Sequence, residues 1–304
     1  ATFGTMGAAA TAASVLRLNT DAFARCLAMA ASAASGIRAN FGTMTKPLHV
    51  GYAARNAVLA ALMAREGVTA NTEILEHPYG YAEVFNHHSG INAAHFENWG
   101  DPLEILTEFG LGLKPYPACG AAHPPIEAAI QIRDQIQGDL DAIEDIRIGV
   151  TEMHFEPMIY DKAANGLEAK FCMGYCIAAA LLDGDVTLQS FEEAEIPRIN
   201  ASGIVGKVRM ELDDRVKGNS EFGSVVTITL NSGQVLEKIV PLAIGKPERW
   251  FPKRKLETKF HDCCSGVISK EHAAKIFTLS QAFEDARSLK PLCKAVGQST
   301  ALAE

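Results

Sequence analysis

The sequence predicts an α plus α/β fold, in which a large helical domain is interrupted by a smaller α/β domain. Up to about residue 110, apolar residues recur with helical spacing and no two-residue alternation appears. Alternating, strand-like segments begin only near residue 144. Helical spacing then returns after about residue 250, so we expect the last segment to pack back onto the first helical region. The expected parts are 1–112 (helical), 113–247 (α/β) and 248–304 (C-terminal helices).

The first part is rich in small residues, which let helix axes approach closely. Residues 6–19 and 21–36 read as two such helices, with Asp21 as the N-cap of the second and Gly36 as its stop. Residues 53–68 read as an amphipathic helix that ends at Gly67. Its apolar positions are Val58, Leu59, Leu62 and Met63, which recur with a period near 3.6.

The middle part mixes helices and strands. Its expected helices are 123–136, with two prolines suited to the first turn, and 168–184, closed by a glycine. Its expected strands are 142–153, 207–214 and a hairpin over 224–240 that turns at 231–233. The C-terminal part then reads as two helices, 256–268 and 269–286.

Composition limits the classes of function. The formal net charge is −8 and the pI is about 5.6, which does not favour nucleic acid or an anionic membrane as partner. Local cations can still make a site for a small anion. The seven cysteines are odd in number and irregularly spaced, which indicates reduced thiols in a cytoplasmic protein.

The stretch "TKPLH" at 45–49 places Lys46 beside Pro47, at the start of an apolar helix. Because the residue before proline avoids the α region, we expect Lys46 to lie in an extended entry to that helix. A lysine near a helix N-terminus suits a carboxylate substrate, and His49 is within reach of the same place. On spacing alone, a solvated lysine and a structural histidine are the commoner interpretations.

The stretch "YPACGAAHPP" at 116–125 places His123 at the start of another helix, where a general acid or base is well located. Tyr175 lies in the middle of a helix, and spacing alone favours a core tyrosine with its hydroxyl at the edge. The neighbouring histidines His87 and His88 are more often solvated than functional. Nucleotide-binding, serine-hydrolase and zinc-protease motifs are absent from the sequence, so the chemistry is cofactor-free acid–base work or none.

A zinc site is an alternative hypothesis. Each of the pairs Cys119/His123 and Cys172/Cys176 places two possible ligands on one helix face. Structural zinc sites favour closer cysteine spacings, and free cysteines also act as small apolar residues, so packing is the commoner interpretation.

Three segments together resemble the MmgE/PrpD family: "GTMTKPLHVGYAARNAVLAALMAREGVT", "KPYPACGAAHPPIEAAI" and "AKFCMGYCIAAALLDGDV". This family contains 2-methylcitrate dehydratase, cis-aconitate decarboxylase and an iminodisuccinate epimerase. The match runs in order along nearly the whole chain. The resemblance implies a large all-helical domain with an inserted smaller α/β lid domain, a homodimer, and no metal or organic cofactor.

The resemblance also implies a site between the two domains. Lys46 matches the family's active-site lysine, Tyr175 matches a tyrosine at the site, and the stretch with His123 matches the lid segment that faces the substrate. These three residues are the expected catalytic groups, and the expected substrate-binding residues are Thr45, His49, Cys119 and Lys170. A histidine of the decarboxylase pattern stands where this chain has Cys119, which counts against cis-aconitate decarboxylation.

The expected function is that of a cofactor-independent lyase, which abstracts an α-proton from a di- or tricarboxylate and eliminates water, like 2-methylcitrate dehydratase. The alternatives are an epimerase that uses the same first step, or an inactive dimerising fragment. Family members are longer at the N-terminus, where they carry an aspartate and histidines of the site. This chain opens at Ala1 within a helix-like segment, so we expect the beginning of its helical region to be missing.

Overall fold

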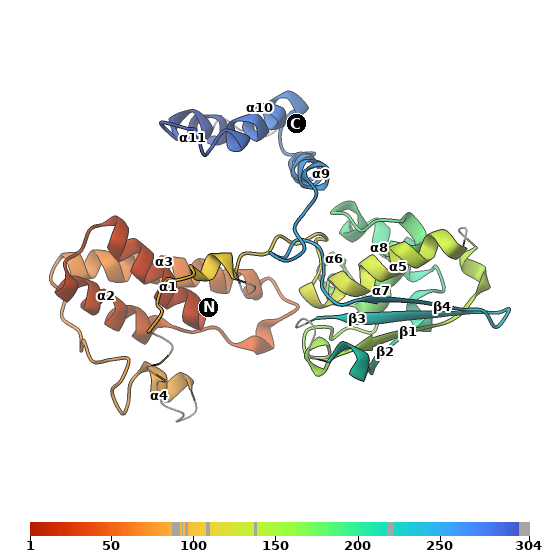
Figure 1. The fold of residues 1–304 in the computed structure, drawn as a ribbon, viewed down its shortest axis with the longest axis horizontal. Coiled ribbons are helices and arrows are strands. Elements are labelled where there is room, and N and C mark those ends of the chain that lie inside the picture. Colours follow the sequence, from red (N-terminus) through yellow and green to blue (C-terminus); the bar gives the residue numbers. More distant parts are fainter. Residues whose placement is uncertain are drawn as a thin grey trace. The chain divides into compact units, whose positions relative to one another are not determined.

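The computed structural model describes residues 1–86, 92, 94, 97–107, 110–136, 139–217 and 222–297. The chain divides into two compact units, Ala1–Leu103 and Glu104–Glu304. The helices of the first unit (Figure 1) are α1 (Thr2–Val15), α2 (Thr20–Ala33), α3 (Thr45–Arg65) and α4 (Tyr81–Phe85).

Helices α1, α2 and α3 pack against one another through alanine. The buried centre of this bundle consists of Ala9, Ala13, Cys26, Ala30, Ala57, Ala60, Ala61 and Ala64. The N-cap of helix α2 is two residues earlier than expected, because the side chain of Asn19 caps the helix by accepting a hydrogen bond from the Ala22 N–H at 2.9 Å. Asp21 therefore lies in the first turn, and the helix ends at Ala33, before Gly36.

The orientation expected for the apolar face of α3 is wrong. Val58 and Leu59 are each 52% exposed, and the buried side is a row of alanines that includes Ala57 and Ala61. Large side chains at those positions would hold α3 away from α1 and α2, whereas alanine allows close contact. Helix α3 also begins at Thr45, so Lys46 is in its first turn and not in an extended entry. Proline is tolerated in a first turn because the N–H groups there have no helical acceptor.

The second unit contains a four-stranded mixed sheet in the order β2-β1-β3-β4. Strand β1 (Ile143–Val150) pairs parallel to β2 (Val208–Leu212) and antiparallel to β3 (Ser224–Leu230), which pairs antiparallel to β4 (Val235–Val240). The β3–β4 hairpin confirms the expected turn, where Gly233 has a φ of 82°. The helices are α5 (His123–Ile136), α6 (Gly166–Ala169), α7 (Met173–Asp183), α8 (Glu195–Asn200), α9 (Lys253–Cys264), α10 (Lys270–Gln281) and α11 (Lys290–Gly297).

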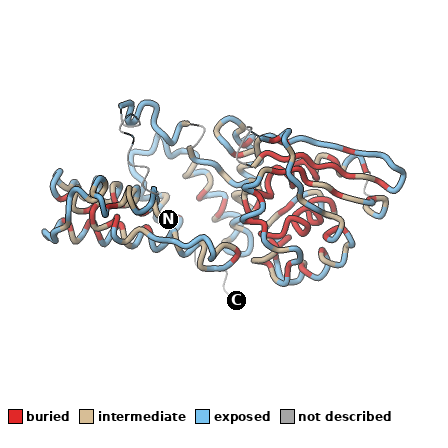
Figure 2. The backbone as a smooth tube through the Cα atoms, turned by 90° about the horizontal axis from the view of Figure 1, so that it is seen from below, coloured by how far each residue is buried: buried red, intermediate tan, exposed pale blue. Residues whose placement is uncertain are grey.

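Helix α7 forms the centre of this unit. Its residues from Met173 to Leu181 are all buried, as expected for a helix that is apolar on every side. It packs on α5, and both helices contact the sheet, so the buried residues gather there (Figure 2). Gly184, with a φ of 75°, ends α7 as the sequence predicted.

Ion pairs between strands and their connections add polar contacts to the sheet. These pairs are Arg209–Asp145, Arg147–Glu211 and Arg215–Glu237. The C-terminal helices confirm the expected helical tail, while their return to the first helical region and the lid arrangement stay predictions. Among the residues that the structure describes, no helix has the length and apolarity needed to span a bilayer.

The buried alanines of α3 allow a prediction about the stability of the first unit. Ala57→Leu is expected to lower the free energy of unfolding of the first unit by about 1–3 kcal/mol, because the site has no room for extra methyl groups. Arg65→Ala, at an exposed residue in the last turn of the same helix, is the control and is expected to change it by less than about 0.5 kcal/mol. Denaturant titration measures both, and an equal loss in the two variants would contradict the described orientation.

Candidate functional site

The first candidate cluster lies at the start of α3. The Nζ of Lys46 is 4.2 Å from the centre of the Phe41 ring, and the guanidinium of Arg38 is 5.8 Å from the same centre. Two cations therefore flank one aromatic ring beside the N-terminal turn of a 21-residue helix. This combination favours a negatively charged group.

The two other residues expected near Lys46 are part of the same cluster. Thr45 is the first residue of α3, and its N–H donates to Thr43 Oγ1 at 3.3 Å. His49 follows Lys46 by three residues and so lies on a similar side of the helix. The His49 ring lies against Gly36, where an added Cβ would be 3.4 Å from its Nδ1. Thr45, Lys46 and His49 therefore all lie within the first five residues of α3, and their roles at a site stay predictions.

The second candidate cluster lies at the start of α5, in the second unit. His123 is the first residue of that helix and is 4% exposed. Its Nε2 is 3.3 Å from the carbonyl oxygen of Ala118, and the Tyr116 ring meets its ring edge-on with centres 5.9 Å apart. Because a carbonyl oxygen can only accept, the nitrogen that faces it must carry the proton.

Lys114 belongs to this second cluster, although no sequence motif marks it as a site residue. Its Nζ donates to the same Ala118 oxygen at 2.9 Å. One carbonyl oxygen thus holds an ammonium group and an imidazole ring beside each other. The available signal was a lysine followed by Pro115 and Pro117, which favour the turn that folds the chain back.

The surroundings of His123 keep its ring neutral. Burial lowers its pKa from 6.5 to about 4, the positive charges of Lys114 and Lys259 lower it further, and the carbonyl groups of Ala118 and Tyr116 partly oppose this. At pH 7 His123 is therefore an uncharged group beside an ammonium ion. A neutral imidazole in this position can accept a proton from a carbon acid.

Cys119 and Lys170 connect the second cluster to the core. The Cys119 N–H donates to the Lys170 carbonyl oxygen at 3.0 Å, which ties the segment before α5 to the segment before α7. The Lys170 Nζ lies 5.5 Å from the centre of the Phe191 ring. The Cys119 side chain is buried, which leaves little of it accessible to a substrate.

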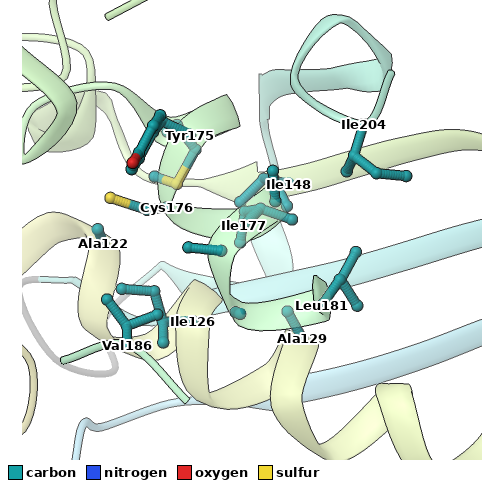
Figure 3. Close-up of a cluster of buried hydrophobic side chains, with 14 of the residues drawn as sticks. Ala122, Ile126, Ala129, Ile148, Tyr175, Cys176, Ile177, Leu181, Val186 and Ile204 are labelled. Carbon is teal, nitrogen blue, oxygen red and sulfur yellow. The ribbon is translucent and has the colours of Figure 1, made fainter. Parts of the chain in front are cut away.

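Tyr175 is a core residue in this structure. It is fully buried, and its hydroxyl donates to the Ser190 carbonyl oxygen at 2.7 Å. Figure 3 shows its ring among the buried side chains around α7, with Cys176 and Ile177 next to it in the helix. Burial raises the pKa of its hydroxyl, which therefore keeps its proton. A catalytic role for Tyr175 stays a prediction.

The structure offers no support for the zinc hypothesis. Burial raises the pKa of both Cys172 and Cys176, which favours neutral thiols. Within the described part of the chain, no group of three or more histidine, cysteine or acidic side chains could hold a metal ion. The His87–His88 pair lies outside the described residues.

A second buried histidine lies near the sheet. His154 is fully buried, its Nδ1 is 3.1 Å from Thr151 Oγ1, and the Phe222 ring meets its ring edge-on. Burial lowers its pKa from 6.5 to about 4. Protonation of either His123 or His154 would therefore lower the stability of the second unit.

Comparisons with known proteins agree with this division of the chain. The family model for the MmgE/PrpD N-terminal domain matches residues 1–94, and the model for the MmgE/PrpD C-terminal domain matches residues 116–285. The chain is 26% identical over 290 residues to cis-aconitate decarboxylase of Homo sapiens, covering 93% of this chain and 59% of the relative. It is 22% identical over 315 residues to cis-aconitate decarboxylase of Aspergillus terreus, covering 96% and 63%. It thus spans about three fifths of the length of these relatives.

The contact between Lys114 and His123 predicts a measurable pKa change. Lys114→Met is expected to raise the pKa of His123 above about 4, because a neighbouring positive charge is lost. The value should stay below 6.5, because burial is the larger cause and remains. NMR titration of the ring protons measures it. Lys217→Met, at an exposed lysine paired with Asp214, is the control and should leave the pKa of His123 unchanged.

The two buried histidines predict how stability depends on pH. Because their pKa values are lower in the folded than in the unfolded chain, the unfolded chain binds more protons between about pH 6.5 and 4. Stability should fall as pH drops through this window, by about 2 kcal/mol per histidine between pH 7 and 5, and level off below about pH 4. His154→Gln should remove about half of this dependence in denaturant titrations. An unchanged slope would show that His154 does not contribute.

Proposed function

The chain belongs to the MmgE/PrpD family, and from this premise we propose that it is part of a cofactor-independent lyase acting on a di- or tricarboxylate. The observation that carries the proposal is the Ala118 oxygen, which holds the Lys114 ammonium and the neutral His123 ring side by side. A cation next to a proton acceptor is the pair needed to remove a proton from the carbon beside a carboxylate.

In the proposed reaction, Lys114 binds a carboxylate of the substrate, and Lys46 has the catalytic role that the family resemblance implies. A base removes the proton from the carbon next to one carboxylate, and negative charge develops on the oxygens of that carboxylate. The adjacent ammonium stabilises this charge more strongly in the transition state than in the ground state. The hydroxyl on the neighbouring carbon then leaves with a proton as water, and a carbon–carbon double bond forms.

His123 is the proposed base. With Nε2 protonated toward Ala118, its other ring nitrogen carries the lone pair. With a pKa of about 4, only about one ring in a thousand is protonated at pH 7. A bound carboxylate offsets the charge of Lys114 and so raises the pKa of His123, which lets the ring hold the proton once substrate is present.

Decarboxylation is the second candidate, and the names of the relatives favour it. In that reaction the bond between carbon dioxide and the substrate breaks, and its electron pair stays on the substrate carbon. That carbon must then take a proton from an acid. A histidine that is neutral before substrate binds is better suited to the first step of dehydration. Epimerisation shares that first step and differs in returning the proton to the opposite face of the carbon. An inactive dimerising fragment remains the non-enzymatic alternative.

We further propose that the protein acts as a cytoplasmic homodimer. Val58 and Leu59 on α3 are each 52% exposed. Exposed apolar side chains of this kind support the proposal that a second copy of the chain covers this side of α3. All seven cysteines are free, and three of them are at least partly exposed, which supports a reducing compartment.

Isotope exchange tests the proposed function. Protein in D2O is incubated with a panel of di- and tricarboxylates, including 2-methylcitrate, and NMR follows deuterium incorporation, alkene formation and carbon dioxide release. Lys46→Ala is expected to slow turnover at least about tenfold, because the family resemblance assigns this lysine to the active site. The control Lys217→Ala should match the unaltered protein.

Alkene formation with water loss supports dehydration, deuterium incorporation without alkene supports epimerisation, and carbon dioxide release supports decarboxylation. The absence of all three, in protein shown to be folded and extended to the length of its relatives, would contradict the proposed function.

A further inference from the structure

Glu127 and Arg249 form an ion pair that the proposed reaction does not use. Glu127 lies one turn after His123 on α5, and its side chain is only 11% exposed. Arg249 comes from the segment between β4 and α9. Its Nη1 donates to Glu127 Oε2 at 2.8 Å and its Nη2 donates to Glu127 Oε1, which makes a two-pronged contact.

The same arginine organises the turn in which it lies. Its Nη1 also donates to the Leu242 carbonyl oxygen at 2.7 Å. The Arg249 backbone exchanges hydrogen bonds with this turn, since its carbonyl accepts from the Gly245 N–H at 2.8 Å and its N–H donates to Lys246. The ion pair therefore anchors residues 242–249, as one turn, to α5.

Residues 242–249 also contact Leu113, the residue before Lys114. The Leu113 N–H donates to the Gly245 carbonyl oxygen at 2.8 Å. Gly245 has a φ of 97°, and an added Cβ would lie 2.0 Å from the Leu113 oxygen, so the two backbones are in close contact. A continuous set of contacts thus runs from Glu127 through Arg249 and Gly245 to Leu113.

From this set of contacts, we propose that Glu127 and Arg249 are positioning residues that hold Lys114 beside His123. His123 and Glu127 both lie on α5, one turn apart. Because Glu127 holds Arg249, and the turn of Arg249 holds Leu113, α5 fixes the position of Lys114 relative to His123. The part of this proposal that concerns catalysis rests on the proposed function, whereas the placement of Lys114 does not.

The variant Glu127→Gln separates positioning from a direct effect of charge. Removing a negative charge would by itself lower the pKa of His123. If the pair positions Lys114, its ammonium moves away from the ring and the pKa rises instead, by on the order of 0.5. Arg249→Lys keeps the charge but loses the two-pronged contact, and it should also raise the pKa. NMR titration of His123 measures both variants.

Two further variants complete the experiment. In a Lys114→Met background, Glu127→Gln should cause no additional rise, because the lysine through which it acts is gone. Asp145→Asn breaks a comparable pair with Arg209 at the sheet and should leave His123 unchanged. A fall or no change in the pKa of His123 in folded Glu127→Gln protein would overturn the proposal.

Turnover provides a second readout. Glu127→Gln is expected to lower kcat/KM with the carboxylate found in the exchange experiment by about tenfold, because a small misplacement of a binding group slows reaction strongly. If no carboxylate reacts, the proposed function fails while the His123 titration still decides whether the pair positions Lys114. A rise in the pKa of His123 with full retention of kcat/KM would overturn the catalytic part alone.

Discussion

One backbone oxygen organises the candidate site of the second unit. The Ala118 carbonyl accepts a hydrogen bond from Lys114 and lies 3.3 Å from the Nε2 of His123, so a charged group and a neutral one share a single acceptor. Burial of His123 makes this possible, because a ring in water would be free to ionise. The start of α5, the prolines around it and the Cys119–Lys170 backbone bond all serve to place that oxygen.

The two units reach their packing by opposite means. The first is a bundle in which alanines form the buried centre, so its helices lie close, and some of its larger apolar residues, such as Val58 and Leu59, face outward. The second buries isoleucine, leucine and aromatic side chains between two helices and a sheet. A rigid core of this kind suits a site whose chemistry depends on small differences in position.

The sequence predicted most of the helices and strands of the fold, whereas the roles of Thr45, Lys46 and His49 at a site stay predictions. Helix ends at Gly184 and the hairpin turn at Gly233 followed from local rules that the structure obeys. The apolar face of α3 was placed on the wrong side, because periodicity gives the apolar stripe but not whether a row of alanines packs more closely. Lys114 was missed because its role depends on a turn and on Gly245, 131 residues further along the chain.

The most direct test of this account follows His123 while a ligand binds. Tricarballylate, a tricarboxylate with no hydroxyl group to eliminate, is titrated into isotope-labelled protein, and NMR records the ring signals of His123. If His123 belongs to the site, these signals shift saturably and the pKa of His123 rises, and both effects are lost in Lys114→Met. Binding detected by calorimetry with no change at His123 would contradict the assignment of this ring to the site.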